Sequence, residues 1–448
     1  MKGYDVVILG GSAAGLTAAI TVRRFYPGKK VLIVRKEDNV LIPCGIPYIY
    51  GTVGSPEKNM VPDAVLEKNN IELLIGEAEK INRNEKTVET DKGDTVKYDK
   101  LIIATGSDPM VPPIKGAERE NIYTVKKDDK YLASLLAEVD KSKDMVIIGG
   151  GFIGMEFADE CKKNRDLNVS VVEMLPHCLM LVFDEDCCKQ GEKLIKERGV
   201  NIITNERVEE ITGNSKVDGV RLSSGKTIKA DLLLIGIGAK PNAKIAIDSG
   251  IEVNEKGSIK VDRYMKTNDE NVFACGDCCE KISFFNKKPV NLMLASIAAN
   301  EARIAGANLY EINRSNEGVI GTYSTVIGDT AFARSGMSVN EAKNNGYDIV
   351  MGQAEAPNCH PGCMPGGSNL KVNLIFEKGT GILIGGQLVG AKSGGELINL
   401  ISGCIYKKMT ADDIATFQMG THPALTASPV AYQISNAAEI AVKELRQQ

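Results

Sequence analysis

The chain has 448 residues, and its formal net charge at pH 7 is −4. This length predicts two or three domains that each bury a core, and the small charge gives no reason to expect a nucleic acid or an anionic membrane as a partner. No apolar run reaches the length of a membrane-spanning helix, and the first residues predict a strand rather than a signal peptide. The eleven cysteines are therefore interpreted as reduced thiols in a cytoplasm, and most are expected to be small buried side chains: Cys161, Cys178, Cys187, Cys188, Cys278, Cys279 and Cys404.

The first predicted unit is a strand, a glycine turn and a helix. The strand is the apolar run Val6–Leu9, the helical pattern starts at Leu16, and the turn between them reads Gly10, Gly11, Ser12, Ala13, Ala14 and Gly15. Backbone N–H groups at such a turn face a pyrophosphate, so the turn predicts a dinucleotide site. Two features depart from the pattern: Ser12 replaces the middle glycine, and Arg35 stands where an acidic residue is expected after the second strand, with Glu37 two residues late.

Cys44 follows this unit and is the most informative single residue of the chain. It has a proline before it and Gly-Ile-Pro after it, a signal for a chain turning into a short helix, where a thiolate is stabilised by the helix dipole. There is no second cysteine four or five residues on. Cys44 therefore predicts a redox centre that cycles through a sulfenic acid or a mixed disulfide, and the alternative is a cysteine packed in a core.

A second strand–turn–helix unit starts at Val146. Its turn is complete, its helix is expected from Met155, and its second strand ends on Glu173. A carboxylate there accepts hydrogen bonds from a ribose and repels a 2′-phosphate, and no cation follows in Met174–Pro176. The unit is therefore predicted to bind NADH rather than NADPH.

Three further strands end on small residues that let the backbone approach a cofactor. One strand ends at Ala104, Thr105 and Gly106, another precedes Gly238, and a third ends on Gly276 and Asp277. A carboxylate at the end of such a strand can hold a polyol hydroxyl, such as the ribityl chain of a flavin. The alternative for Asp277 is a helix N-cap.

The C-terminal part predicts an α+β unit without a cofactor motif. Leu370–Glu377 and Ile382–Val389 are expected to form a hairpin about the turn 378–381, with helices from Gly395 and Pro429. The segment Cys359–Cys363 contains His360 between two thiols, a pattern that allows a metal site, a second redox pair or a thiol that handles polysulfide. Zinc is disfavoured because only three soft ligands are present, and a surface loop with incidental thiols is the main alternative.

These motifs and their order resemble, throughout the length of the chain, those of a known family. This family is the FAD- and NAD(P)H-dependent pyridine nucleotide–disulfide oxidoreductases. Within it the chain is most similar to the single-cysteine branch of coenzyme A disulfide reductases, NADH oxidases and peroxidases, and NAD(P)H sulfur reductases. The resemblance implies an α/β chain with two Rossmann-like domains, for FAD and NAD, and a C-terminal α+β dimerisation domain that joins a homodimer. The implied domains are an FAD domain at 1–110 and 245–320, an NAD(H) domain at 111–244 and the dimerisation domain at 321–448.

The resemblance also assigns roles to residues. It implies that Cys44 is catalytic, with His422 as a candidate acid or base for a leaving thiol; a packing histidine is the alternative, because Ala427 stands where paired-cysteine reductases carry a glutamate. Arg23 and Arg24 are candidate contacts for the phosphates of coenzyme A, and a solvated helix face is the alternative. No metal is implied. The implied cofactor-binding residues are Gly10, Gly11, Ser12, Ala13, Ala14, Gly15, Arg35, Ala78, Ala104, Thr105, Gly106, Gly149, Gly151, Phe152, Ile153, Gly154, Glu156, Glu173, Gly238, Gly276, Asp277, Leu294 and Ala295.

Three functions are consistent with these features. The first is the reduction of coenzyme A disulfide, persulfide or polysulfide by NADH through FAD and Cys44. The second is an NADH oxidase or peroxidase that uses a Cys44 sulfenic acid; family members of that type place a histidine in the first glycine turn, where this chain has Ala13. The third is a flavoprotein that passes electrons to a protein partner or signals through it, which needs neither Cys44 nor a dimerisation domain.

Overall fold

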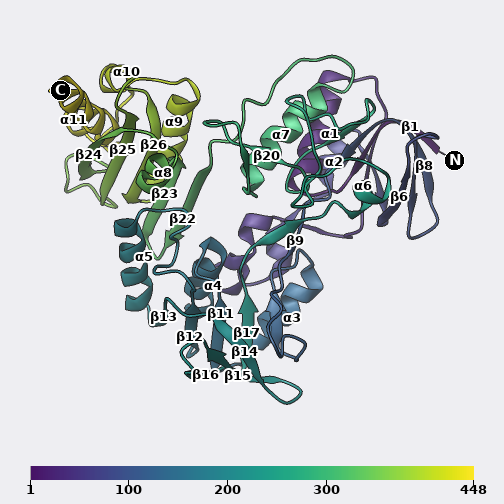
Figure 1. The fold of residues 1–448 in the computed structure, drawn as a ribbon, viewed down its shortest axis with the longest axis horizontal. Coiled ribbons are helices and arrows are strands. Elements are labelled where there is room, and N and C mark those ends of the chain that lie inside the picture. The colour runs from purple at the N-terminus through teal and green to yellow at the C-terminus, as the bar shows by residue number, and fades with distance from the viewer. Residues whose placement is uncertain (1, 448) are drawn as a thin grey trace. The chain divides into compact units, whose positions relative to one another are not determined.

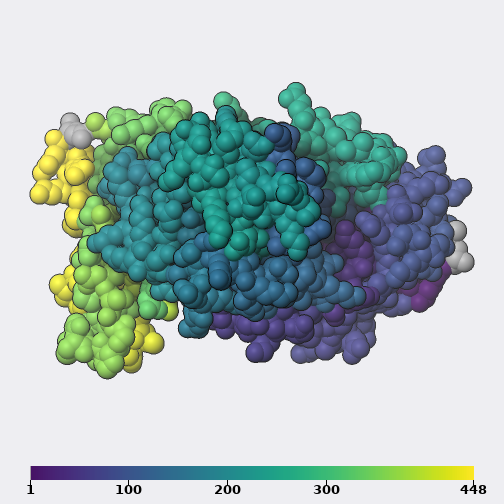
Figure 2. Space-filling view, turned by 90° about the horizontal axis from the view of Figure 1, so that it is seen from below, coloured from purple at the N-terminus to yellow at the C-terminus, as the bar shows by residue number. Residues whose placement is uncertain are grey.

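The computed structural model describes residues 2–447 and divides the chain into two compact units (Figure 1). Chain positions are coloured along the same scale in the space-filling view of Figure 2. Unit 1 consists of Met1–Pro113, Ala117–Ser142 and Leu234–Val319, and unit 2 of Ile114–Gly116, Lys143–Leu233 and Ile320–Gln448. The chain passes from unit 2 back to unit 1 within strand β17 (Leu232–Ile235).

Unit 1 is built on a seven-stranded sheet in the order β5-β2-β1-β8-β7-β6, with β19 paired to β8. Its strands are β1 (Lys2–Leu9), β2 (Val31–Arg35), β5 (Glu72–Ile75), β6 (Ala78–Asn82), β7 (Thr87–Thr90), β8 (Thr95–Ile103) and β19 (Val272–Ala274). The pairs β1–β2, β1–β8, β2–β5 and β8–β19 are parallel. Leu9 pairs with Ile103, and Ile103 with Ala274. The carboxyl ends of three strands therefore meet at one edge, the usual place of a ligand in such sheets.

Two helices of unit 1, α1 (Ala13–Phe25) and α7 (Ala295–Ala307), lie side by side (Figure 1). Their contact is close because Gly306 packs on the Ala18 carbonyl, where a Cβ would come within 2.8 Å of the oxygen. The other elements of unit 1 are shorter: β3 (Val40–Leu41), β4 (Met60–Val61), α2 (Ala64–Lys68), β9 (Ser107–Pro109), β10 (Ile122–Thr124), α3 (Asp129–Val139), β18 (Ala239–Pro241), α6 (Lys244–Asp248), β20 (Lys281–Ile282) and β21 (Pro289–Val290).

Unit 2 begins with a second parallel arrangement, β11 (Asp144–Ile148) beside β12 (Asn168–Val172) beside β13 (Val200–Ile203). Helices α4 (Phe152–Lys162) and α5 (Glu185–Glu197) belong to it. A three-stranded antiparallel sheet follows, made of β14 (Val208–Gly213), β15 (Val217–Leu222) and β16 (Thr227–Lys229).

The rest of unit 2 is a five-stranded antiparallel sheet in the order β22-β23-β26-β25-β24. The expected hairpin is confirmed: β25 and β26 pair antiparallel about the turn 378–381. The last helix starts later than the predicted Pro429, because Pro429–Ala431 forms a 3₁₀ turn first. The elements are β22 (Thr322–Ile327), β23 (Thr330–Gly336), α8 (Val339–Asn344), β24 (Ile349–Pro357), β25 (Asn369–Glu377), β26 (Leu383–Gly390), α9 (Gly394–Tyr406), α10 (Ala411–Thr416) and α11 (Gln433–Arg446).

The predicted fold class is confirmed, with two nucleotide-type sheets that contain parallel strands and a C-terminal α+β part; in unit 1 the strands β6, β7 and β8 pair antiparallel. Helices α1 and α4 each begin three residues earlier than the predicted Leu16 and Met155, because the last residues of each glycine turn already form the first helical turn. Among residues 2–447, no helix combines the length and apolarity needed to cross a membrane.

Candidate functional site

The two glycine turns have matching backbones. Gly10 and Gly149 have φ of +107° and +105°, values that L side chains rarely adopt. A Cβ on Gly15 or Gly154 would overlap the carbonyl of Gly10 or Gly149. Each helix can therefore start directly at the end of its strand only because these positions lack a side chain.

The substitution at Ser12 is compatible with this geometry. Ser12 is the N-cap of α1 with φ −84° and ψ −159°, and Gly151 is the N-cap of α4 with φ −73° and ψ −171°. A Cβ on Gly151 would meet nothing within 4 Å. The middle position of the turn therefore does not require glycine, and Ser12 leaves the backbone unchanged.

Both helix N-termini fit the phosphates of a dinucleotide. Neither α1 nor α4 has a side-chain cap or an acidic residue in its first turn. Their first backbone N–H groups are thus directed outward, with no carboxylate in the first helical turn to repel an anion. This arrangement is what a pyrophosphate requires.

The edge formed by β1, β8 and β19 brings several predicted residues of unit 1 together. A Cβ on Gly10 would overlap the Ala104 carbonyl, and a Cβ on Gly276 would lie 2.8 Å from the Cβ of Ala14. Asp277 follows Gly276, and it accepts a hydrogen bond from the Ser107 hydroxyl at 2.9 Å. The helix N-cap alternative for Asp277 is excluded, because the next helix is α7, whose N-cap is Leu294.

The residues Thr105 and Gly106 tie this edge to the returning chain. The Thr105 hydroxyl donates to the Asn242 carbonyl at 2.5 Å, and the Asn242 N–H donates to the Gly106 carbonyl at 2.9 Å. Gly238, with φ +107°, accepts from the Met110 N–H. The segment after β8 and the segment after β17 are thereby fixed against each other within unit 1.

Arg35 is turned toward protein groups. Its guanidinium binds both carboxylate oxygens of Asp63, at 2.8 and 2.7 Å, and the carbonyls of Glu37 and Asp38, both at 2.8 Å. Its aliphatic stem packs on Gly11, where a Cβ would lie 2.6 Å from Cδ. The charged end of Arg35 therefore holds its own loop, and the stem is the part that borders the glycine turn.

Cys44 lies exposed in a loop with a fixed frame. The loop consists of two 3₁₀ turns, Pro43–Gly45 and Pro47–Tyr50, where a short helix was predicted, so the stabilising dipole is that of a single turn. The buried Asn59 fixes the start of this loop. The side-chain amide of Asn59 donates to the Ile42 carbonyl at 3.0 Å, and the backbone carbonyl of Asn59 accepts from the Ile42 N–H at 2.9 Å. The thiol is thus presented at the surface of unit 1 rather than packed in its core.

In the second glycine turn, Glu173 is buried and directly bound to the turn. Its carboxylate accepts from the Gly150 N–H at 2.7 Å and from the Leu175 N–H at 2.8 Å. Met174 beside it has a side chain that is 66% exposed. A ligand that approaches the end of β12 therefore meets a carboxylate whose neighbour in the chain is apolar.

Two other predicted residues of this turn make contacts within unit 2. Phe152 stacks on Tyr323 and meets Phe183 edge-on, with ring centroids 5.7 and 5.8 Å apart. Glu156 accepts a hydrogen bond from the Thr325 hydroxyl at 2.7 Å, and burial raises the pKa of Glu156 to about 7. The side chains of Phe152 and Glu156 therefore join α4 to strand β22. The two residues between them in the predicted set differ in burial: Ile153 is exposed and Gly154 is buried.

The remaining predicted residues are placed as follows. Arg23 donates to the carbonyls of Asn69 and Lys29, at 3.0 and 2.6 Å, so its head group serves the fold, whereas Arg24 is exposed. Ala78 pairs with Thr90 in the β6–β7 hairpin. Ala295 is the first residue of α7. Only Arg24 of the two arginines is thus available to a ligand phosphate.

The C-terminal residues that the sequence singled out lie in two loops that contact each other. The His360 N–H donates to the Pro423 carbonyl at 2.9 Å, and His360 Nδ1 lies 3.0 Å from the Thr426 carbonyl. His422 is exposed, and its Nδ1 accepts from the Ala424 N–H at 3.2 Å. Cys363 is exposed and Cys359 is buried. His422 belongs to unit 2 and Cys44 to unit 1.

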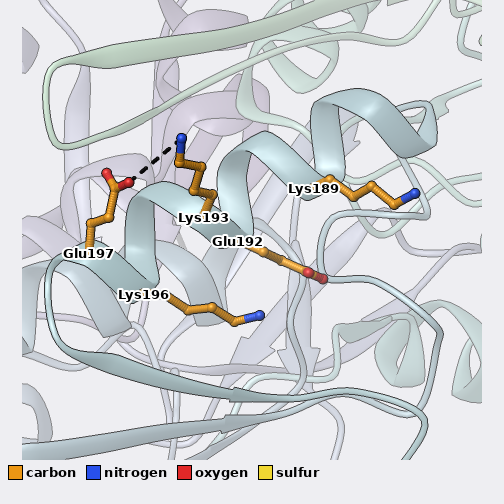
Figure 3. Close-up of a pocket in the computed structure, with 5 residues that line it drawn as sticks. All are labelled: Lys189, Glu192, Lys193, Lys196 and Glu197. Atoms are coloured by element: carbon orange, nitrogen blue, oxygen red, sulfur yellow. Dashed lines mark ion pairs between the residues drawn. The ribbon is translucent and has the colours of Figure 1, made fainter.

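The cysteines expected to be buried are buried, which confirms that interpretation for all seven. In the described part of the chain, no three His, Cys, Asp or Glu side chains gather in a way that could hold a metal ion. A surface hollow of about 430 Å³ lies on α5, and Figure 3 shows its lining: Lys189, Glu192, Lys193, Lys196 and Glu197. The lining consists of three lysines and two glutamates of one helix, α5.

Several residues near the site carried no recognisable motif in the sequence. Ser107 follows Ala104–Gly106 directly and could have been included with it. Lys127, whose Nζ lies 4.0 Å from the Asp277 carboxylate, and Asn59 could not, because only the folded chain brings them to the site.

Comparisons with known proteins agree with this geometry. The family model described as pyridine nucleotide-disulphide oxidoreductase matches residues 4–302, and the model of its dimerisation domain matches residues 322–431. The chain is 29% identical to an NADH oxidase of Methanocaldococcus jannaschii, over 98% of this chain and 99% of that protein. It is 31% identical to the CoA-dependent NAD(P)H sulfur oxidoreductase of Pyrococcus furiosus, over 88% of this chain and 89% of that protein.

Solved structures give the same result. An NAD-dependent persulfide reductase from A. fulgidus superposes with a TM-score of 0.90 at 31% identity, covering 99% of this chain and 84% of that one. The cofactors that the two glycine turns predict, FAD and NAD(H), are the cofactors of this family, and residues 322–431 are its dimerisation domain. With two matching nucleotide-binding turns, an exposed loop cysteine and family matches across most of its length, the chain belongs to the pyridine nucleotide–disulphide oxidoreductases.

Proposed function

We propose that this protein uses NADH to reduce a disulfide or sulfane-sulfur substrate, of the class of coenzyme A disulfide, persulfide or polysulfide, through FAD and the single thiol of Cys44. The observation that carries the proposal is the exposed Cys44 in a loop whose entrance is fixed by Asn59. A thiol that must attack sulfur has to be accessible, and it has to stay in one position beside its electron donor. Relatives named for CoA-dependent sulfur reduction and persulfide reduction support the substrate class.

In this proposal Cys44 does the covalent chemistry. The first glycine turn and Asp277 would hold FAD, which when bound would supply to sulfur the two electrons of a hydride from NADH. The Cys44 thiolate attacks one sulfur of the substrate, the substrate S–S bond breaks, and a thiolate leaves as Cys44 forms a mixed disulfide. The two electrons then break the mixed disulfide, which releases the second thiol and restores the Cys44 thiolate.

The leaving thiolates must be protonated, and His422 is the proposed donor, reached across a homodimer formed through the dimerisation domain. The exposure of His422 supports this role. The hydrogen bond found for its ring involves Nδ1 and not Nε2. On the nucleotide side, Glu173 and the exposed Met174 support NADH as the donor. Arg24 is the arginine of the first helix proposed to contact phosphates of coenzyme A.

A second candidate is an NADH oxidase, favoured by the similarity along almost the whole chain to a relative of that name. Ala13 in the first turn counts against it. The two are separated by anaerobic and aerobic steady-state oxidation of NADH with coenzyme A disulfide, polysulfide, peroxide and oxygen as alternative acceptors. The sulfur-reductase proposal expects the highest kcat/KM with a sulfur acceptor, a loss of at least about tenfold with His422→Gln, and no change with a His177→Gln control. A higher kcat/KM with oxygen or peroxide would contradict it.

A further inference from the structure

A buried ion pair lies directly behind the Gly276–Asp277 turn of unit 1. Lys281 on β20 and Glu301 on α7 are 3.0 Å apart, and their side chains are 4% and 0% exposed. Neither residue belongs to a nucleotide-binding motif, and the two are brought together from separate elements.

The pair holds the backbone on both sides of Gly276. The Gly276 N–H donates to Glu301 Oε2 at 2.9 Å, and Lys281 Nζ donates to the Gly276 carbonyl at 2.6 Å. Both peptide groups that flank Gly276 are therefore bound by charged partners, which make stronger hydrogen bonds than neutral ones. Cys279 adds to the cluster, with its Sγ 3.3 Å from both the Gly276 carbonyl and Lys281 Nζ.

This arrangement is a poor device for stability alone. Removing two charges from water is costly, and an apolar pair of similar volume often serves a core as well or better. Moreover, Glu301 Oε1 is buried without a hydrogen-bond partner among the described residues. Burial and the charge of Glu301 raise the pKa of the Cys279 thiol well above its ordinary value, so this neighbour contributes only a weak donor. The pair is better explained by what it holds in place.

What it holds is a crowded turn next to the cofactor edge, in a conformation that favours glycine. Gly276 has φ +82°, and a Cβ there would lie 2.8 Å from Ala14 in the first glycine turn. The next residue, Asp277, accepts from Ser107 at 2.9 Å. Any rotation of the peptide groups of Gly276 would redirect the Asp277 carboxylate.

We propose that Lys281 and Glu301 are positioning residues for FAD: by clamping both peptide groups of Gly276 they aim the Asp277 carboxylate at the flavin's polyol chain. The proposal rests on the assignment of Asp277 to FAD, and it is independent of which acceptor the enzyme reduces. It predicts that FAD affinity follows the hydrogen bonds to Gly276 and not the stability of the fold.

The test compares two replacements that separate these properties. Lys281→Met with Glu301→Met removes both hydrogen bonds to Gly276 and keeps the side-chain volume. Because the two buried charges are also removed, which offsets much of the cost of the unpaired backbone groups, the apoprotein should unfold only slightly below the wild-type temperature while the Kd for FAD rises about tenfold. Glu301→Gln keeps an acceptor for the Gly276 N–H but leaves Lys281 without its anion. This variant should unfold at a lower temperature than the double variant and yet bind FAD within about threefold of wild type.

Apoprotein freed of flavin is titrated with FAD by fluorescence quenching, and unfolding is followed by circular dichroism. Arg83→Met, which breaks the Arg83–Asp269 ion pair of the same unit, is the matched control and should leave the Kd unchanged. Asp277→Ala is measured alone and combined with the double methionine variant. The methionine effect should largely disappear in the Asp277→Ala background, because the clamp then has no carboxylate to aim.

Three results would overturn the proposal: a wild-type Kd in the double methionine variant, a Kd order that follows thermal stability, or an equal methionine effect with and without Asp277. If the double variant does not fold, the Glu301→Gln variant still decides, since a large loss of FAD affinity there contradicts the proposal. A wild-type Kd for Asp277→Ala removes the assignment of Asp277 and the clamp with it. None of these results depends on the acceptor assays that test the reductase function.

Discussion

The backbone N–H of Gly150 donates to the Glu173 carboxylate at a distance of 2.7 Å. The residue proposed to select the ribose of NADH thus also supports the glycine turn that faces the pyrophosphate. Its other oxygen accepts from the Leu175 N–H. Replacing Glu173 by arginine would therefore change specificity and turn geometry together, and the exposed Met174 is the better position for a change of specificity.

Met174→Arg combined with Glu173→Gln should shift the preference toward NADPH. The glutamine amide oxygen keeps one acceptor for the turn, the negative charge is lost, and the arginine adds a cation for a 2′-phosphate. We expect the ratio of kcat/KM for NADPH to that for NADH to rise at least about tenfold, measured by steady-state kinetics with a saturating acceptor. Met180→Arg, at another exposed methionine of unit 2, is the control and should leave the ratio unchanged. An unchanged ratio in the double variant would remove Glu173 from ribose selection.

Cys44→Ser should separate the two halves of the reaction. The serine hydroxyl stays protonated at neutral pH, so the covalent route to sulfur is lost, whereas flavin reduction by NADH needs no thiol. We expect rapid mixing to show flavin bleaching by NADH at the wild-type rate and turnover with a sulfur substrate lowered by about three orders of magnitude or more. Cys363→Ser, at the other exposed cysteine, is the control. Sulfur turnover near the wild-type rate in Cys44→Ser would make Cys44 a structural residue.

Asn59→Ala should slow the sulfur half-reaction without affecting the nucleotide half. It removes the amide that bonds the Ile42 carbonyl and opens space beside Gly45, whose Cα faces the Asn59 amide. Loss of one buried hydrogen bond should lower the unfolding free energy by about 1–3 kcal/mol, and a looser Cys44 should react about tenfold or more slowly. Asn308→Ala, a similarly buried asparagine of unit 1, is the control for stability alone. Equal slowing in both variants would show that the effect comes from stability and not from the loop.

Glu156→Gln should change how stability depends on pH. The folded-state pKa of Glu156 is about 7, above its ordinary value of 4.5, because burial disfavours its charged form. Between pH 4.5 and 7 the folded state binds more protons than the unfolded state, so wild-type stability should fall as pH rises through this window. Glutamine cannot ionise, and the variant should therefore lose less stability than the wild type as pH rises through this window.

Compared with the wild type, the variant should gain about 1–2 kcal/mol of relative stability by pH 8. This is less than the full pKa difference would give, because Glu156 is only partly shielded from solvent. The measurement is the unfolding temperature of the apoprotein against pH for both proteins. Parallel curves from pH 5 to 8 would contradict the raised pKa. Glu396→Gln, at another glutamate of unit 2, is the control.

Elements that depend on local residue spacing can be predicted from the sequence. The residues Gly10, Gly15, Gly149 and Gly154 predict both strand–turn–helix units, because only glycine permits the positive φ and the close approach of helix to turn. The C-terminal hairpin about 378–381 could likewise be predicted from alternating apolar residues and turn residues. Cys44 was identified by its neighbours in the chain, and its exposure required the structure.

The partners of the charged and polar side chains could not be predicted from the sequence and are known from the folded chain. Arg35 binds Asp63, 28 residues away, and Thr325 binds Glu156, 169 residues away. Lys281 and Glu301 meet behind Gly276 although they come from a short strand and from the middle of a helix. Local sequence pattern sets backbone conformation, but the pairing of buried polar groups depends on which elements the apolar core packs together, and that information is spread over the whole chain.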